Sequence, residues 1–311
     1  MNLPYLSISI CIITYKRPLL LKQLLDSLYS QSINKRHLIT ITIVDNDKSG
    51  SAKNIVNQYQ LNSLFPLVYK IETKRGIPFA RNTAIHLSKG NDVIIFIDDD
   101  EIAESDWLQN LINTYINNDY HIVAGPVKRK YEIEPPKWIK KLNIFTQKEY
   151  RDGEIIDSSG TGNILFSNEI LNFSEAPFDE RFPLTGGTDS LLLSDLKKLG
   201  YKIIWSKNAV VTELVPKSRL TLKWILHRSF RIGNTQILHL IIREGSVIQI
   251  VFKLISAIFR FLKGLFILII GLLLFNKLIM VKALMNFSRS FGVILGVLGI
   301  KFNEYKKTHG G

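Results

Sequence analysis

The chain has 311 residues, of which 46% are hydrophobic and 22% are charged, so it can bury a large core and is not a disordered protein. Its single cysteine, Cys11, lies inside an apolar run, where we expect it to pack in the core. One cysteine excludes an intramolecular disulfide framework and a cysteine-rich zinc site. The length fits one large catalytic domain with an appendage, or two modest domains.

The formal net charge of +13 is concentrated in the last third of the chain. Residues 1–213 contain 25 basic and 25 acidic residues, whereas residues 214–311 contain 15 Lys and Arg against only Glu244 and Glu304. In this last part the basic residues stand among Leu, Ile, Phe and Val. That setting favours an anionic membrane surface over a nucleic acid as the partner, because nucleic-acid binders present solvated basic patches.

The first hundred residues alternate strand-like and helix-like segments. Apolar runs rich in β-branched residues predict strands at residues 7–13, 39–44, 67–71 and 93–97. Helical spacing of apolar residues predicts helices at residues 18–30, 52–61 and 79–87. The alternation predicts an α/β fold whose mostly parallel, Rossmann-like sheet is covered by helices on both faces. Residues 120–213 are punctuated by Pro and Gly, and we expect them to complete the same domain.

The residues that follow the predicted strands are the first place to seek a site, because ligands bind at the carboxyl ends of parallel strands. Three clusters, at residues 14–18, 45–47 and 98–101, occupy such positions and should converge on one crevice. Four adjacent acids at 98–101 repel each other unless a cation or hydrogen-bond donors compensate, and oxygen ligands favour Mg²⁺ or Mn²⁺. The alternative is a solvated acidic loop that caps a helix beginning near Asp106.

The sequence contains neither a glycine-rich dinucleotide fingerprint after the first strand nor a phosphate-binding P-loop. A phosphate-bearing donor would therefore be held by a metal ion and by basic side chains. Asp45, directly after the second strand, is a candidate acceptor of hydrogen bonds from a nucleotide, and a turn-forming Asp is the alternative.

Five sequence blocks occur in order along the chain. They are I-C-I-I-T-Y-K-R-P at 10–18, V-D-N at 44–46, R-G-I-P-F-A-R-N at 75–82, I-D-D-D at 97–100 and G-G-T-D at 186–189. Together they resemble the family 2 glycosyltransferases of the GT-A fold. A later run, E-L-V-P at 213–216 with H-R-S-F-R-I-G at 227–233, is similar to the succinoglycan-type glucosyltransferase subgroup, bacterial enzymes that build lipid-linked saccharides.

The resemblance, which covers residues 7–235, implies a role for each matching position. Asp189 would be the catalytic carboxylate, although Thr188 stands where the family usually has a Glu. Asp100 would bind the divalent metal that bridges the donor diphosphate, and Glu213 is a candidate further ligand. The candidate donor-binding residues are Thr14, Tyr15, Arg17, Asp45, Arg75, Arg81, Asp98, Asp99, His227, Arg228 and Arg231.

Two of these assignments have local structural alternatives. Asp189 precedes an amphipathic helix predicted at residues 190–199, so it could serve as that helix's N-cap as well as a base. His227, Arg228 and Arg231 are expected to share one helical face with Trp224, where they would grip the diphosphate or face anionic lipid.

We predict three parts. Residues 1–213 form the nucleotide-sugar-dependent catalytic domain. Residues 214–245 form a basic helical extension that completes the site, and residues 246–311 form apolar, basic membrane-associating helices. A polar stripe is predicted along one helix, because polar residues recur at a spacing of four or three: Gln249, Lys253, Ser256, Arg260 and Lys263. Segments 264–281 and 283–300 approach the length of a bilayer span, so a short hairpin through the membrane, a re-entrant anchor and an in-plane anchor all remain open. A soluble helical cap is a further alternative.

The predicted function is metal-dependent, inverting transfer of a sugar from a nucleotide diphosphate-sugar, UDP-linked, to a membrane-held saccharide or lipid-linked acceptor. It would act in cell-surface polysaccharide assembly at the cytoplasmic face of the bacterial inner membrane. No nucleic-acid partner is expected. The alternatives are a nucleotidyltransferase on a related fold, which the absence of glycines at 14–18 disfavours, and a non-catalytic basic membrane scaffold.

Overall fold

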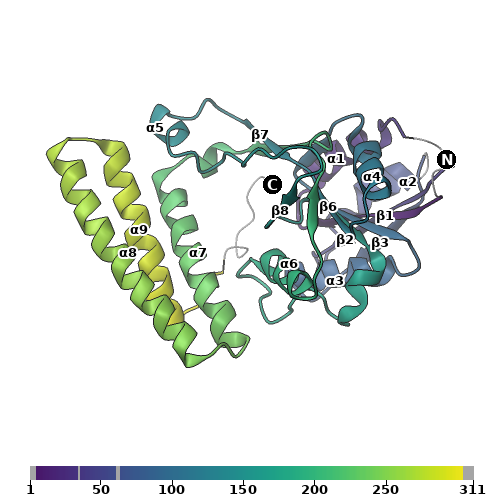
Figure 1. Cartoon of the computed structure of the whole chain (residues 1–311). Coiled ribbons are helices and arrows are strands. Elements are labelled where there is room, and N and C mark those ends of the chain that lie inside the picture. Colours follow the sequence, from purple (N-terminus) through teal and green to yellow (C-terminus); the bar gives the residue numbers. More distant parts are fainter. Residues whose placement is uncertain (1–4, 34–35, 61–63, 304–311) are drawn as a thin grey trace.

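The computed structural model describes residues 5–33, 36–60 and 64–303. These residues form an α/β domain and, beside it, a layer of three long helices (Figure 1).

The first half of the α/β domain follows the predicted alternation. Strands β1 (Ser7–Thr14), β2 (Leu38–Asp45), β3 (Leu67–Ile71) and β4 (Val93–Asp98) are parallel and are linked by helices α1 (Pro18–Tyr29), α2 (Lys53–Gln60) and α3 (Ile77–Leu87). The four strands and three helices predicted from the sequence are therefore confirmed, with the ends that can be compared displaced by at most two residues. The predicted end of the second helix, at residue 61, lies outside the described residues.

The second half extends this sheet with strands of mixed direction. The full order is β3-β2-β1-β4-β9-β6-β10-β8, in which β9 (Asn163–Ser167) lies antiparallel between β4 and β6 (Ile122–Ala124). The outer strands are β10 (Ile203–Trp205) and β8 (Ile155–Ile156). A second, three-stranded sheet pairs β5 (Glu101–Ala103) and β7 (Val127–Tyr131) with β11 (Val211–Val215). The division after residue 213 that we expected falls inside β11.

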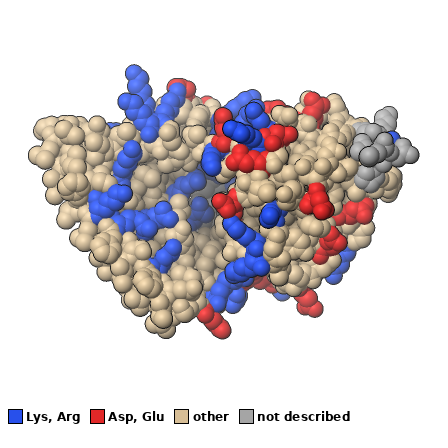
Figure 2. Space-filling model, viewed as in Figure 1, with Lys and Arg blue, Asp and Glu red and all other residues tan. Residues whose placement is uncertain are grey.

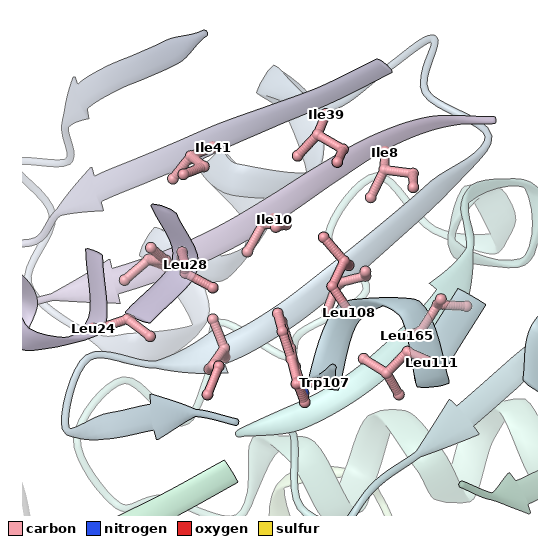
Figure 3. Close-up of a cluster of buried hydrophobic side chains, with 14 of the residues drawn as sticks. Ile8, Ile10, Leu24, Leu28, Ile39, Ile41, Trp107, Leu108, Leu111 and Leu165 are labelled. Atoms are coloured by element: carbon pink, nitrogen blue, oxygen red, sulfur yellow. The ribbon is translucent and has the colours of Figure 1, made fainter. Parts of the chain in front are cut away.

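Both faces of the central sheet are buried because its strands are apolar at successive positions. Ile8 and Ile10 of β1 point toward α1 and α4 (Trp107–Asn117), where Leu24 and Trp107 meet them (Figure 3). Cys11 points to the other face, against α3, the 3₁₀ helix η1 (Asn168–Phe173) and α6 (Thr188–Lys198). Burial raises the pKa of the Cys11 thiol to about 11, which fits its expected role in packing.

The three long helices are α7 (Leu222–Ile242), α8 (Val247–Leu273) and α9 (Lys277–Val297), and α9 lies between the other two (Figure 1). Glycines let the helices approach closely, since a Cβ at Gly233 of α7 would clash with the carbonyl oxygen of Arg289 on α9. Gly264 and Gly271 of α8 contact Phe287 and Met280 of α9 in the same way. Two short helices, α5 (Lys137–Lys140) and η2 (Lys217–Arg219), complete the part of the chain that the structure describes.

Candidate active site

A cavity of about 560 Å³ opens at the carboxyl ends of β1 and β4 and is closed on its far side by the first turns of α7. Figure 2 shows it as the hollow between the two parts of the molecule, with Lys and Arg side chains around and within it. The site residues predicted from the sequence that line this cavity are Thr14, Tyr15, Arg17, Arg75, Arg81, Asp98, Asp99, Asp100, Asp189, Glu213, Arg228 and Arg231.

The acidic run lies beside β1 because β1 and β4 end together, with Ile13 opposite Asp98 in the strand register. The Thr14 hydroxyl donates a hydrogen bond of 2.8 Å to Asp99, and the Arg17 guanidinium donates to Asp99 at 3.0 Å and to Asp100 at 3.2 Å. Thr14 and Arg17 thus compensate part of the negative charge of the four adjacent acids. The acidic run is not a solvated loop.

Asp98 and Glu101 belong to the same cluster, and Glu101 is the more deeply buried of the two. Burial raises the pKa of Asp98 to about 6, against the opposing effect of Arg81, whose guanidinium lies 3.4 Å away. Asp100, Asp189 and Glu213 raise it further, so the charges of four carboxylates act on one another across the cavity. The pKa of Glu101 is raised well above its usual range, first by burial and then by its acidic neighbours. A cation placed among these carboxylates would relieve their mutual repulsion.

One arginine, Arg219, contacts the carboxylates of both Asp100 and Glu213. The guanidinium of Arg219 lies 3.8 Å from Asp100 and 2.5 Å from Glu213, and Arg129 contacts Glu213 at 3.1 Å. Within residues 5–33, 36–60 and 64–303, no group of three or more His, Cys, Asp or Glu side chains is placed to hold a metal ion. A divalent ion here would be held by one or two carboxylates and would take its other ligands from water and phosphate oxygens, as Mg²⁺ commonly does. The oxygen-only donor set of Asp100 and Glu213 fits that mode of binding.

Asp189 enters the cavity from the first turn of α6. Gly186 and Gly187, at φ +77° and +81°, make the preceding turn, and Gly187 is the N-cap residue. The N-cap role considered for Asp189 is therefore wrong, because α6 begins two residues before the predicted helix. An acidic side chain in this first turn interacts favourably with the helix dipole.

The turn before Asp189 is held from behind by α7. Thr235 donates a hydrogen bond of 3.3 Å to the carbonyl oxygen of Thr185, and the His239 ring packs edge-on against Phe182 with a centroid distance of 4.5 Å. His239 also forms a hydrogen bond with the backbone of Gly186, and burial lowers its pKa to about 4, so the ring is neutral at pH 7. No local signal in the sequence links residue 239 to this turn, and only the packing of α7 on α6 brings the two together.

Replacing Gly187 by Ala should displace Asp189. The new Cβ would lie 2.9 Å from the His239 ring and 3.0 Å from the Thr235 methyl group, in a backbone conformation that costs an L residue about 1–2 kcal/mol. We expect turnover to fall at least tenfold and denaturant unfolding to show a loss of stability. Gly299→Ala is the matched control, because Gly299 has the same φ of +81° and no atom lies within 4 Å of the point that its new methyl group would occupy. Equal losses in both variants would contradict the contact argument.

Three residues of α7 form the far wall of the cavity. Trp224, Arg228 and Arg231 follow the i, i+4, i+7 spacing of one helical face, and the Arg228 guanidinium lies 5.3 Å from the centre of a Trp224 ring. Burial lowers the pKa of Arg228 to about 10, and the charges of Arg231, Arg129 and Arg219 add to this effect. No carboxylate among the described residues forms an ion pair with Arg228, so its guanidinium presents a positive charge to an anion in the cavity.

Asn46 is a site residue that the donor-binding set omitted. Its side-chain amide donates hydrogen bonds to the carbonyl oxygens of Glu72 (3.1 Å) and Lys74 (2.7 Å) and accepts one from the Gly76 N–H (2.7 Å). The loop held in this way carries Arg75, whose guanidinium lies 5.0 Å from the centre of the Tyr15 ring. The sequence feature that could have identified Asn46 as a site residue is its position directly after β2.

Two predicted donor-binding residues lie elsewhere. Asp45 does not line the cavity, because its carboxylate is fully buried and accepts hydrogen bonds from the Ala52 N–H (2.7 Å) and the Tyr69 hydroxyl (3.0 Å), as the turn-forming alternative expects. His227 is exposed and packs near Phe302, with ring centroids 6.1 Å apart. Successive helical residues are rotated by about 100°, so His227 does not share the cavity-facing side of Arg228.

The fold is that of the GT-A glycosyltransferases. The crystal structure of residues 1–349 of TarS from S. aureus in complex with UDP superposes with a TM-score of 0.53 and 15% identity, over 94% of this chain and 92% of that one. The mannosyltransferase PcManGT from Pyrobaculum calidifontis, solved with GDP-Man and Mn²⁺, gives a TM-score of 0.54 and 16% identity, over 95% and 74%.

The chain belongs to glycosyltransferase family 2, whose family model matches residues 9–172. It is 30% identical over 236 residues to the succinoglycan biosynthesis protein ExoM of Rhizobium meliloti, covering 74% of each chain. It is 27% identical over 183 residues to a glucosyl-dolichyl phosphate glucuronosyltransferase of Haloferax volcanii, covering 53% of this chain and 56% of the relative. This membership favours sugar transfer over the nucleotidyltransferase and scaffold alternatives.

Proposed function

We propose that the protein is a metal-dependent, inverting hexosyltransferase that moves a sugar from a UDP-sugar to a membrane-held saccharide or lipid-linked acceptor. The observation that carries the proposal is the placement of Asp189 and the acidic run in one cavity, opposite an arginine-lined wall. Membership of family 2, the polysaccharide relative and the UDP-bound structural neighbour support it.

The donor would lie between the acidic run and α7. In this arrangement Arg228 attracts the diphosphate, because no described carboxylate forms an ion pair with it, and Arg231 lies on the same face of α7. Tyr15 and Arg75, whose guanidinium lies over the Tyr15 ring, would line the nucleotide side of the cavity. Thr14 and Arg17 hold Asp99 in place, while Arg81 orients Asp98 toward the ribose or sugar.

Mg²⁺ or Mn²⁺ would be held by Asp100, with Glu213 as the candidate second ligand. When bound, such an ion neutralises the charge that develops on the departing nucleoside diphosphate. Arg219, which contacts both carboxylates, keeps them close together and limits their mutual repulsion.

Asp189 would act as the single base. Its carboxylate accepts the proton of the acceptor hydroxyl as that oxygen bonds to the anomeric carbon and the bond to the diphosphate oxygen breaks. A single displacement inverts the anomeric configuration. Thr188, buried in the position where an acid was expected, leaves Asp189 as the only carboxylate of the pair.

The acceptor would be met at the cytoplasmic face of the bacterial inner membrane. Support comes from the basic, apolar segment 246–303 and from the two helices within it, α8 and α9, which are long and apolar enough to cross a membrane. A soluble cap would leave the apolar surface of α8 uncovered.

The proposed activity predicts stabilisation by its donor. A nucleotide-sugar at about 100 times its Kd should stabilise the fold by ~2.7 kcal/mol, so a thermal-shift screen of UDP-sugars with Mn²⁺ should identify the donor. NMR of the product made from that donor should show the opposite anomeric configuration. Retention would contradict the single-base mechanism, and release of pyrophosphate from a nucleoside triphosphate would favour the nucleotidyltransferase instead.

A further inference from the structure

The outer face of α8 carries a continuous apolar surface with no protein partner among the described residues. Phe252, Phe259, Phe266 and Leu273 recur every seven residues along this face and are 65%, 67%, 66% and 73% exposed. Figure 1 shows α8 at the edge farthest from the α/β domain, and this edge is almost free of charged side chains in Figure 2. A water-soluble surface rarely leaves so many large apolar groups together.

The second candidate span, α9, is enclosed on two sides. Ser290 of α9 donates a hydrogen bond of 2.9 Å to the carbonyl oxygen of Ala257 on α8, and Arg289 donates one of 3.3 Å to Gln236 on α7. The Asn234 amide of α7 donates to the carbonyl oxygens of Gly292 (3.1 Å) and Ile300 (2.8 Å). These contacts bind α9 to α7 along much of its length.

This attachment opposes a hairpin that crosses the bilayer. α7 carries Arg228 and Arg231 into the active-site cavity, so a spanning α9 would have to bring this polar helix into the hydrocarbon or separate from it. Charged side chains in the bilayer centre are costly, by several kcal/mol each even on the most permissive scales. The layers therefore follow the order α/β domain, α7, α9, α8, and the exposed large apolar side chains of the described helices are concentrated on α8.

The flank of α8 is polar and cationic. Gln249, Lys253, Ser256, Arg260 and Lys263 form the stripe predicted from the sequence, beside the apolar outer face. No acidic residue occurs between Glu244 and Glu304, so an anionic headgroup layer complements this flank. A second copy of the chain does not complement it, because two such stripes brought together would repel.

We propose that α8 lies in the plane of an anionic bilayer surface, with its outer face among the acyl chains and its cationic stripe at the level of the headgroups. This in-plane arrangement deepens the membrane association proposed above and does not depend on which sugar is transferred. It also decides between the spanning and interfacial anchors that the sequence left open.

The depth of α8 distinguishes the two modes. Fluorophores attached to single cysteines at positions 252, 259, 266 and 273 sample points separated by about 10 Å, and about 31 Å in total, at a rise of 1.5 Å per residue. Cys11 does not compete for the label because it is fully buried. Quenching by lipids that carry bromine at known depths, in phosphatidylcholine vesicles with phosphatidylglycerol, should place all four labels at the same shallow depth. A gradient from one interface through the centre would overturn the proposal.

A flotation assay tests the partner itself. The full chain should float with these vesicles, and Phe252→Glu, Phe259→Glu and Phe266→Glu combined should reduce the floated fraction at least tenfold. The matched control replaces Leu19, Leu38 and Leu199, which are 73%, 60% and 56% exposed on the α/β domain, by Glu, and this variant should float like the wild type.

Each remaining outcome has a defined meaning. A wild-type chain that binds UDP-sugar without floating would overturn the docking proposal and leave the proposed function standing. A chain that floats without binding any nucleotide-sugar would support the docking proposal and overturn the proposed function. A wild-type dimer that fails to float and is made monomeric by the triple Glu variant would assign the face to a second copy of the chain.

Discussion

Replacing Asp189 by Asn should lower the rate of sugar transfer by about 10²–10⁴, with little change in donor affinity. The amide keeps the size of the side chain and its place in the first turn of α6, but it cannot accept the acceptor's proton. Turnover is measured with the donor identified by thermal shift, and affinity by the same shift as a function of donor concentration. Asp189→Glu should retain more activity than Asp189→Asn, because it keeps a proton acceptor displaced by one methylene.

The control for this prediction lies on the same helix. Asp195 of α6 pairs with Arg243 and with Lys198 and does not line the cavity, so Asp195→Asn should cost stability without a comparable loss of turnover. If the two variants lost activity in proportion to their stability, Asp189 would be a structural residue and the proposed base would be refuted.

Asp100→Asn should abolish most metal-dependent donor binding and nearly all turnover. The neutral amide is a poor ligand for a hard divalent cation, and the substitution also removes the negative charge that Arg17 and Arg219 face. The measurement is the affinity for the UDP-sugar by calorimetry, with Mn²⁺ and with EDTA. The wild type should bind strongly only with Mn²⁺, whereas the variant should bind weakly in both conditions.

Asp106→Asn provides the matched comparison, because Asp106 is an exposed acid that follows the same run outside the cavity. It should retain the Mn²⁺ response and the activity of the wild type. Activity that survives both EDTA and Asp100→Asn would remove the metal from the proposed mechanism and leave charge neutralisation to the arginines of the cavity.

The sequence predicted the first half of the domain well because its signals are local. Alternating apolar runs set the positions of β1 to β4, and the acids at 98–101 follow a buried strand whose end must lie at the ligand-binding edge of a parallel sheet. The insertion of β9 between β4 and β6, in the opposite direction, was not predictable in this way. It depends on pairing between segments that are far apart in the chain.

The corrections at Asp45 and His227 have the same origin. A carboxylate after a strand can face either a ligand or its own turn, and the Tyr69 hydroxyl and the Ala52 N–H that capture Asp45 come from neighbouring elements. For His227, a spacing of four to Arg231 suggested a shared face. Tertiary packing instead turns the face of α7 that carries Trp224 and Arg228 toward the cavity.

By itself the sequence determined the βα alternation, the acids at the strand ends, the resemblance to family 2 and the segregation of positive charge into the last third of the chain. Periodicity and composition are local properties of the sequence. They indicate that a helix has an apolar face, but they do not indicate which part of the protein or its surroundings packs against that face. Only the tertiary structure decided that α7 closes the cavity and supports the turn before Asp189, that α9 is enclosed by its neighbours, and that the apolar face of α8 is left open. Those choices depend on close contacts between helices, made at glycines such as Gly233 and Gly292, whose partners lie more than fifty residues away.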